Sequence, residues 1–309
     1  MFGFIVRRFL WAIPVIIVIS MISFSLMHAV PGNPFDTNPD KPLPPTIVER
    51  LRTFYNLDQP LPKQYADYMW NVLRGDLGPS YQYRDRTVNE IIGGHFGVSV
   101  KLGLLGLGVA LIIGVPLGIV SALKQNTAVD YFAMFFAISG VSVPAMTLGP
   151  FLIWFFALQL GVLPVARWGS FQQAILPMIT LGIGGAAILA RLTRASMLQV
   201  IREDYIRTAR AKGVSERMVT IKHALRNALI PVVTVLGPML AALVTGSMIV
   251  ERIFAIPGLG KYYVEAVSAR DYPVIMGMTL VYAVLLVTAN LVVDITYSWI
   301  DPRIRVEER

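Results

Sequence analysis

Few residues in this sequence could carry out catalysis or bind a metal ion. The chain of 309 residues has no cysteine, which excludes disulfides, thiolate metal sites and thiol nucleophiles. Its histidines, His28, His95 and His223, are far apart, and no pair has metal-ligand spacing. One Gly-Lys pair occurs, at 260–261, but Tyr262 follows it where a phosphate-binding loop needs Ser or Thr. We therefore expect no catalytic residue, no metal, no cofactor and no nucleotide site of that type on this chain.

One carboxylate stands out beside the apolar sequence. Asp294 follows the last long apolar run, close to its expected inner end. Ionisable groups inside a membrane are costly and often functional, so Asp294 is a possible intramembrane polar site. Its shallow position also fits a plain role in capping or pairing with basic residues nearby. No acidic residue lies near the middle of any apolar run, which disfavours an ion-coupled carrier.

The segment before the fifth apolar run has helical signals. Residues 204–212 read as a short helix that begins at Asp204, and Gly213 suits its C-terminal cap. Ser215 then precedes a second helix, whose first turn it could cap.

This second helix is expected to be amphipathic. Met218, Ile221 and Leu225 follow helical spacing and would form one apolar stripe, with basic residues such as Arg226 around it. Such a helix either lies on a membrane surface or enters a groove of another protein, and the pattern alone favours neither.

Six long apolar runs must position these residues. Apolar residues make up 55 % of the chain and charged residues only 15 %, well below the charge of a soluble domain. A spanning helix needs about 20 apolar residues. We read the first run as an uncleaved helix, because it is longer than the apolar part of a signal peptide. The expected spans lie within residues 9–30, 102–123, 131–166, 168–190, 228–250 and 272–293.

The basic residues predict the orientation of these spans. Positively charged residues concentrate on the cytoplasmic side of membrane proteins. With the N-terminus inside, six crossings return the C-terminus to the inside, and the inner segment 191–227 carries nine Lys or Arg against three acids. This topology accounts for the net charge of +8, so nucleic acid is not needed as a partner. The nine bases are Arg191, Arg194, Arg202, Arg207, Arg210, Lys212, Arg217, Lys222 and Arg226.

Three regions follow from the spans. Residues 1–30 form the N-terminal tail and first helix, 31–97 an extracytoplasmic segment, and 98–309 a core of five further helices that includes the loop 191–227. Short helices are expected at 46–54 and 62–73 of the outer segment, and a turn at 257–260. The helices expected at 102–123 and 168–190 are rich in glycine, which predicts close packing, and Pro144 and Pro150 predict kinks in the third span.

The inner segment resembles the cytoplasmic loop of binding-protein-dependent ABC import permeases. The similarity rests on DYIRTARAKG at 204–213 followed by HALRNALIP at 223–231, and it is closest to the oligopeptide, dipeptide and nickel group. Of the general Glu-Ala-Ala-x-x-x-Gly pattern, only Ala209 and Gly213 are kept. Further short motifs resemble those of the first of the two permease subunits: PGNP at 31–34, GDLG at 75–78, PGLG at 257–260, RDYP at 270–273 and DPR at 301–303.

The resemblance implies an all-α membrane protein with six transmembrane helices of the importer type, in the cell inner membrane. It implies a non-catalytic permease for di- or oligopeptides that binds no cofactor itself. Its partners would be a second homologous permease, two ATPase subunits that bind ATP and Mg, an extracytoplasmic peptide-binding protein and membrane lipid. It also favours the protein groove over the membrane surface for the amphipathic helix. The implied coupling residues are Asp204, Ala209, Gly213, Ser215, Met218, Ile221, Leu225 and Arg226.

Two other functions stay open at this point. A nickel or glutathione importer permease has the same sequence motifs. A secondary transporter driven by an ion gradient is the alternative from another class, and uptake without ATPase partners would distinguish it.

Overall fold

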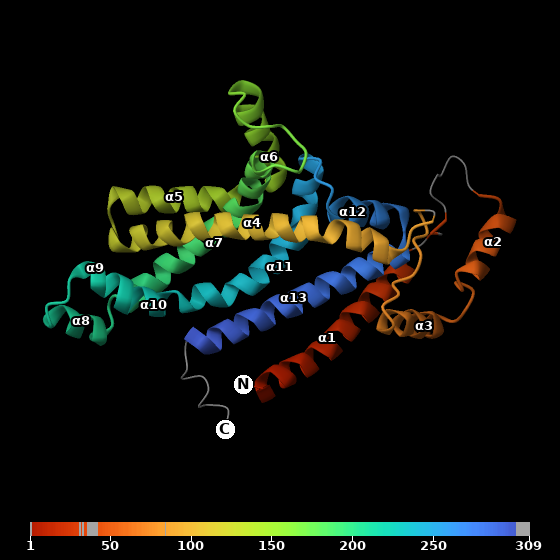
Figure 1. Ribbon diagram of the computed structural model, residues 1–309, viewed down its shortest axis with the longest axis horizontal. Coiled ribbons are helices and arrows are strands. Elements are labelled where there is room, and N and C mark those ends of the chain that lie inside the picture. Colours follow the sequence, from red (N-terminus) through yellow and green to blue (C-terminus); the bar gives the residue numbers. More distant parts are fainter. Residues whose placement is uncertain (1, 31, 33, 36–42, 84, 301–309) are drawn as a thin grey trace. The chain divides into compact units, whose positions relative to one another are not determined.

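The computed structural model describes residues 2–30, 32, 34–35, 43–83 and 85–300, without the side chains of 2–6, 9 and 294–300. The described chain is helical, and its one extended pairing is an isolated bridge between Pro79 and Thr87. The α-helices are α1 (Phe2–Ala29), α2 (Pro45–Phe54), α3 (Leu61–Leu73), α4 (Val88–Leu123), α5 (Ala128–Ser142), α6 (Ala145–Leu152), α7 (Phe171–Val200), α8 (Asp204–Ala211), α9 (Glu216–Met218), α10 (Leu225–Ala228), α11 (Ile230–Ile253), α12 (Leu259–Ala269) and α13 (Tyr272–Ile300); the π-helices are η1 (Ile153–Gln159) and η2 (Val219–Ala224) (Figure 1).

Among the described residues, five helices are long and apolar enough to cross a membrane: α1, α4, α7, α11 and α13. A sixth span results if the bent pair 128–142 and 145–159 is counted as one. The expectation of an all-α membrane protein is confirmed.

Helix α4 begins well before the predicted start of the second span. The side chains of Thr87 and Glu90 each bond the backbone N–H of the other residue, at 3.2 Å and 3.1 Å. This reciprocal capping box fixes the start of the helix. The predicted outer segment 31–97 therefore contains the first turns of α4.

The third span is broken rather than kinked. Its two halves, on either side of Val143 and Pro144, meet at an angle of 106°. Proline has no N–H to donate and disfavours helical backbone in the residue before it. Val143 accordingly has extended φ and ψ angles of −92° and 113°. Pro150 lies inside α6 and does not end that helix.

The described chain forms two compact units, and each is built from segments distant in sequence. The first unit contains Met1–Val98 and Gly258–Val287, and the second contains Ser99–Pro257 and Thr288–Arg309. Helices α4 and α13 each begin in the first unit and end in the second.

The first unit is held together by an apolar core and by one buried carboxylate. The core comes from the start of α4, from α12 and from the start of α13. Asp271, fully buried between α12 and α13, accepts bonds from the Ser80 hydroxyl and from the N–H groups of Tyr81 and Gln82, both at 3.2 Å. Asp271 thereby ties the loop before α4 to the turn before α13.

Helix α12 is absent from the sequence prediction. The predicted turn at 257–260 is too long, because α12 already begins at Leu259 with Gly258 as its N-cap residue. Helix α12 is short and has no long apolar run, so hydropathy does not indicate it.

The second unit is built around α7. Small residues bring α4 close to it: a Cβ on Gly114 would lie 2.4 Å from the carbonyl oxygen of Ala186, and one on Gly182 would lie 2.4 Å from that of Gly106. These distances confirm the close packing predicted from the glycines. Helix α5 also packs along α7, through Ala137, Ala187 and Ala190.

Candidate functional site

The candidate site is the helical hairpin formed by α8 and the run α9–η2–α10. Helix α8 ends as the sequence predicts. Gly213 has a positive φ of +77°, its N–H donates to the Arg210 carbonyl at 2.9 Å, and the Val214 N–H donates to that of Ala209 at 3.2 Å. This is a Schellman motif, and glycine takes its left-handed position without steric cost.

The second arm of the hairpin differs from the predicted α-helix. Its middle part, η2, is a π-helix, whose bonds run from i to i+5 and so widen the turn. Ser215 is the N-cap residue, and its carbonyl accepts the Val219 N–H at 2.9 Å, but its side chain makes no capping bond. The predicted side-chain cap is therefore wrong. An ion pair closes the hairpin instead: both guanidinium nitrogens Nε and Nη2 of Arg210 bond the Glu216 carboxylate, at 2.7 Å and 3.2 Å.

The hairpin rests on the ends of α4 and α7 through a buried apolar cluster, called here the hairpin seat. Helix α8 contributes Ile206 and Ala209, and the second arm contributes three small or branched residues. The members of the hairpin seat are Ala122, Met197, Ile206, Ala209, Val219, Ala224 and Ala228. Since Ala209 is buried here, its small size is explained by packing.

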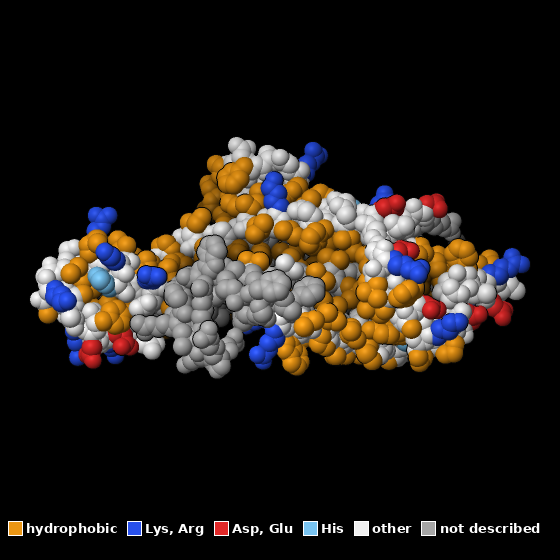
Figure 2. Space-filling model, turned by 60° about the horizontal axis from the view of Figure 1, so that its bottom comes forward, with side chains coloured by type: hydrophobic (Ala, Val, Ile, Leu, Met, Phe, Trp, Pro, Cys, Tyr) orange, Lys and Arg blue, Asp and Glu red, His pale blue; other side chains and the backbone are white. Residues whose placement is uncertain are grey.

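The predicted apolar stripe is split between two faces. Met218 and Ile221 are 45 % and 54 % exposed, whereas Leu225 is half-buried against the hairpin seat. The expectation of a single stripe is wrong because the widened η2 turn changes the angle between Ile221 and Leu225. Figure 2 shows hydrophobic side chains among Lys and Arg side chains over this end of the second unit.

The remaining predicted residues lie in different surroundings. Asp204 is the first residue of α8 and is exposed, with its carboxylate 3.5 Å from the Arg207 guanidinium. Arg226 on α10 is exposed. Asp294 belongs to α13, but its side chain lies outside the described residues.

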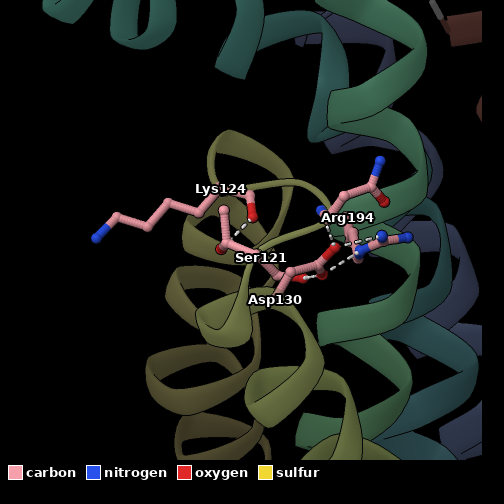
Figure 3. A network of polar contacts seen from close by, with 6 residues as sticks. Ser121, Lys124, Asp130 and Arg194 are labelled. Atoms are coloured by element: carbon pink, nitrogen blue, oxygen red, sulfur yellow. Dashed lines mark hydrogen bonds and ion pairs between the residues drawn. The ribbon is translucent and has the colours of Figure 1, made fainter.

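A polar network that the sequence does not indicate lies beside the hairpin seat. Asp130, in the first turn of α5, accepts Nε and Nη2 of Arg194 on α7, each at 2.7 Å. The Ser121 hydroxyl on α4 and the Asn126 N–H, at 3.0 Å, bond the same carboxylate. Figure 3 shows Asp130, Ser121 and Arg194 converging, while the Lys124 side chain points away. The available signal was weak: opposite charges at the same predicted end of two spans.

The first unit contains a cavity of about 340 Å³ between α1, α3 and the start of α13. His28, Tyr68, Tyr81 and Tyr272 are among its lining residues. Burial raises the pKa of Tyr68 and of Tyr81, and the nearby carboxylates of Asp76 and Asp271 respectively add to the effect, so both phenols stay neutral. The Nδ1 atom of His28 lies 2.9 Å from the Phe24 carbonyl oxygen, which fits a structural histidine.

Two family models match this chain. A family model described as the inner membrane component of binding-protein-dependent transport systems matches residues 114–306, and a model for the N-terminal part of such components matches residues 1–92. The chain belongs to this family. It is thus a membrane component of a transport system, as the resemblance implied.

Relatives match over almost their whole length. The dipeptide transport system permease protein DppB of Bacillus subtilis is 44 % identical over 99 % of both chains. The oligopeptide permease protein OppB of Haemophilus influenzae is 41 % identical over 99 % of this chain and 100 % of its own. The glutathione permease protein GsiC of Shigella flexneri is 42 % identical over 99 % of both chains.

A solved structure confirms the fold. A chain of the MetNI methionine ABC transporter, in an inward facing conformation, superposes with a TM-score of 0.58 at 20 % identity. The match covers 68 % of this chain and 96 % of that one.

Proposed function

We propose that this chain is the permease subunit of an ATP-driven importer for di- or oligopeptides. The observation that carries the proposal is the end-to-end identity with dipeptide and oligopeptide permeases, 44 % and 41 %. Its partners are a second homologous permease, two ATPase subunits and an extracytoplasmic peptide-binding protein. ATP and Mg bind to the ATPases, and this chain forms part of the pathway.

The hairpin α8–α10 is the part of this chain that meets an ATPase. Three features support this role: the hairpin is closed by the Arg210–Glu216 pair, it is seated on α4 and α7, and it exposes Met218 and Ile221. Exposed apolar side chains on a rigid helix suit insertion into a protein groove. The surrounding bases support a cytoplasmic location for this hairpin and for both termini.

The decisive test changes the exposed apolar pair. We expect Met218→Glu with Ile221→Glu to fold, because both side chains are about half exposed. In proteoliposomes with the three partner types, ATP-driven peptide uptake should fall by at least about tenfold, the effect of losing ~1.4 kcal/mol of ATPase contact. Co-purification of the ATPases should fall in parallel.

Leu73→Glu is the matched control. Leu73 ends α3 in the first unit and is 76 % exposed, so it tests the effect of one glutamate at an exposed apolar position outside the hairpin. Its uptake should stay near that of the wild type. Normal uptake by the double variant would refute the role of the hairpin, whereas no ATP-driven uptake by the wild-type complex would refute the function.

Glutathione is a second candidate substrate, since the 42 % identity with a glutathione permease is as high as that with the oligopeptide permease. A competition experiment distinguishes them: unlabelled glutathione lowers the uptake of a labelled dipeptide only if both use the same transporter.

A further inference from the structure

We propose that Asp130 and Arg194 are a positioning pair, which holds α5 in fixed register on α7 so that movement of the hairpin carries α5 with it. This inference rests on the proposed function. It concerns residues outside the hairpin, in a polar network to which the proposed function assigns no part.

The pair is built for one geometry. Asp130 is 2 % exposed, and its carboxylate accepts four hydrogen bonds, two on each oxygen: Arg194 Nε and Ser121 on Oδ1, Arg194 Nη2 and Asn126 on Oδ2. Four donors use the full acceptor capacity of a carboxylate. A bidentate arginine pair also fixes direction, which a single-point contact does not.

The apolar contact between α5 and α7 lacks such direction. Its buried members are alanines: Ala137 on α5 lies against Ala187 and Ala190 on α7, with the partly buried Met134 of α5 packed against them. Alanine methyl groups contribute buried contact area but do not interlock. This surface therefore favours contact between α5 and α7 but only weakly fixes the position of one helix along the other. A buried ion pair can supply that specificity even where it adds little net stability.

The pair also lies directly beside the hairpin seat. Ser121 is followed by Ala122, and Arg194 precedes Met197 by one helical turn; Ala122 and Met197 both belong to the hairpin seat. Helices α4 and α7 therefore each contribute one residue to the seat and a near neighbour to the network. A displacement of the hairpin that shifts the end of α7 reaches Asp130, and hence α5, through two short bonds.

The first measurement is coupling in the reconstituted complex. With Arg194→Lys, ATP hydrolysis should continue, while peptide uptake per ATP falls about tenfold, the loss expected for one charge-assisted bond. Arg191→Lys is the control, because Arg191 is an exposed residue one turn earlier on the same helix. Unchanged uptake per ATP in an assembled Arg194→Lys complex would overturn the proposal.

A disulfide tests register directly, and the chain has no cysteine of its own to interfere. A Cβ on Gly140 would lie 3.5 Å from the Cβ of Ala187, within the range of disulfides, so Gly140→Cys with Ala187→Cys joins α5 to α7. In the wild-type background the oxidised bridge should leave uptake unchanged, because the two helices already move together. In the Arg194→Lys background it should restore uptake per ATP.

Two outcomes of this second test overturn the proposal. Loss of uptake on oxidation in the wild-type background, reversed by reduction, would show that α5 slides on α7 during transport. A bridge that forms but fails to rescue Arg194→Lys would show that the pair does not act through register. If Arg194→Lys does not assemble, the bridge in the wild-type background still tests whether α5 slides on α7, and loss of uptake there overturns the proposal. Failure of the proposed function itself is distinct, since the unbridged wild-type complex would then show no ATP-driven uptake.

Discussion

At the scale of single residues, Gly213 closes α8 in a conformation that side chains disfavour. Its φ is +77°, and no heavy atom lies within 4 Å of where a Cβ would be, so a substitution there meets strain without a clash. Gly213→Ala should cost about 1–2 kcal/mol, the penalty of the left-handed region. Asparagine tolerates that region better. As the temperature rises, the alanine variant should therefore lose peptide uptake first, the asparagine variant next and the wild type last. Equal profiles for all three would contradict this prediction.

The residues of the candidate site were predictable only where local chemistry decides. Glycine at the end of α8 is such a case, because a helix cap depends on adjacent residues. Leu225 is the opposite case: the π-helical turn that directs it onto the hairpin seat has no local signature in the sequence. Asp130 and Arg194 are 64 positions apart, so the only signal that they meet is their opposite charge at the same predicted end of two spans.

At the scale of helices, Gly118 determines how closely α4 approaches α7. A Cβ there would lie 2.5 Å from the Ala190 carbonyl oxygen and 2.6 Å from the Thr193 Cβ. Gly118→Ala must push the helices apart, at a cost of about 1–3 kcal/mol for overpacking. Thermal unfolding of the purified complex should show a lower midpoint.

Gly108→Ala on the same helix is the comparison, because a Cβ there meets no atom within 4 Å. Alanine is also the better helix former, so its midpoint should be equal or slightly higher. Equal destabilisation by both changes would argue against close packing as the role of Gly118.

Helix existence was predictable to a large extent, and helix ends were not. Long apolar runs indicated α1, α4, α7, α11 and α13, because lipid requires such runs. At Pro144 the sequence predicts only a kink, since it shows that a helix is interrupted but not the direction of the following segment. Helix α12 was missed because its burial depends on α4 and α13, which are distant in sequence.

At the scale of the whole molecule, the basic hairpin sets a testable topology. Single cysteines replacing Lys212 and Arg50 should react with a membrane-impermeant maleimide from opposite sides. In cells whose cytoplasmic membrane is intact and whose outer face is open to the reagent, Arg50→Cys should be labelled. Lys212→Cys should be labelled only after that membrane is permeabilised. The cysteine-free wild type gives the background. The reverse pattern would contradict the predicted orientation and with it the proposed contact with the ATPases.

The bond between Ser80 and Asp271 also has a consequence for biogenesis. These residues are 191 positions apart, so the loop before α4 leaves the ribosome long before its anchor exists. At elongation rates of about 5–20 residues per second, the delay is about 10–40 s. Throughout that interval the nascent N-terminal third cannot complete its own core, which needs α12 and the start of α13. Truncation before Asp271 should therefore yield a product that quality-control proteases degrade, even though its first spans are already inserted.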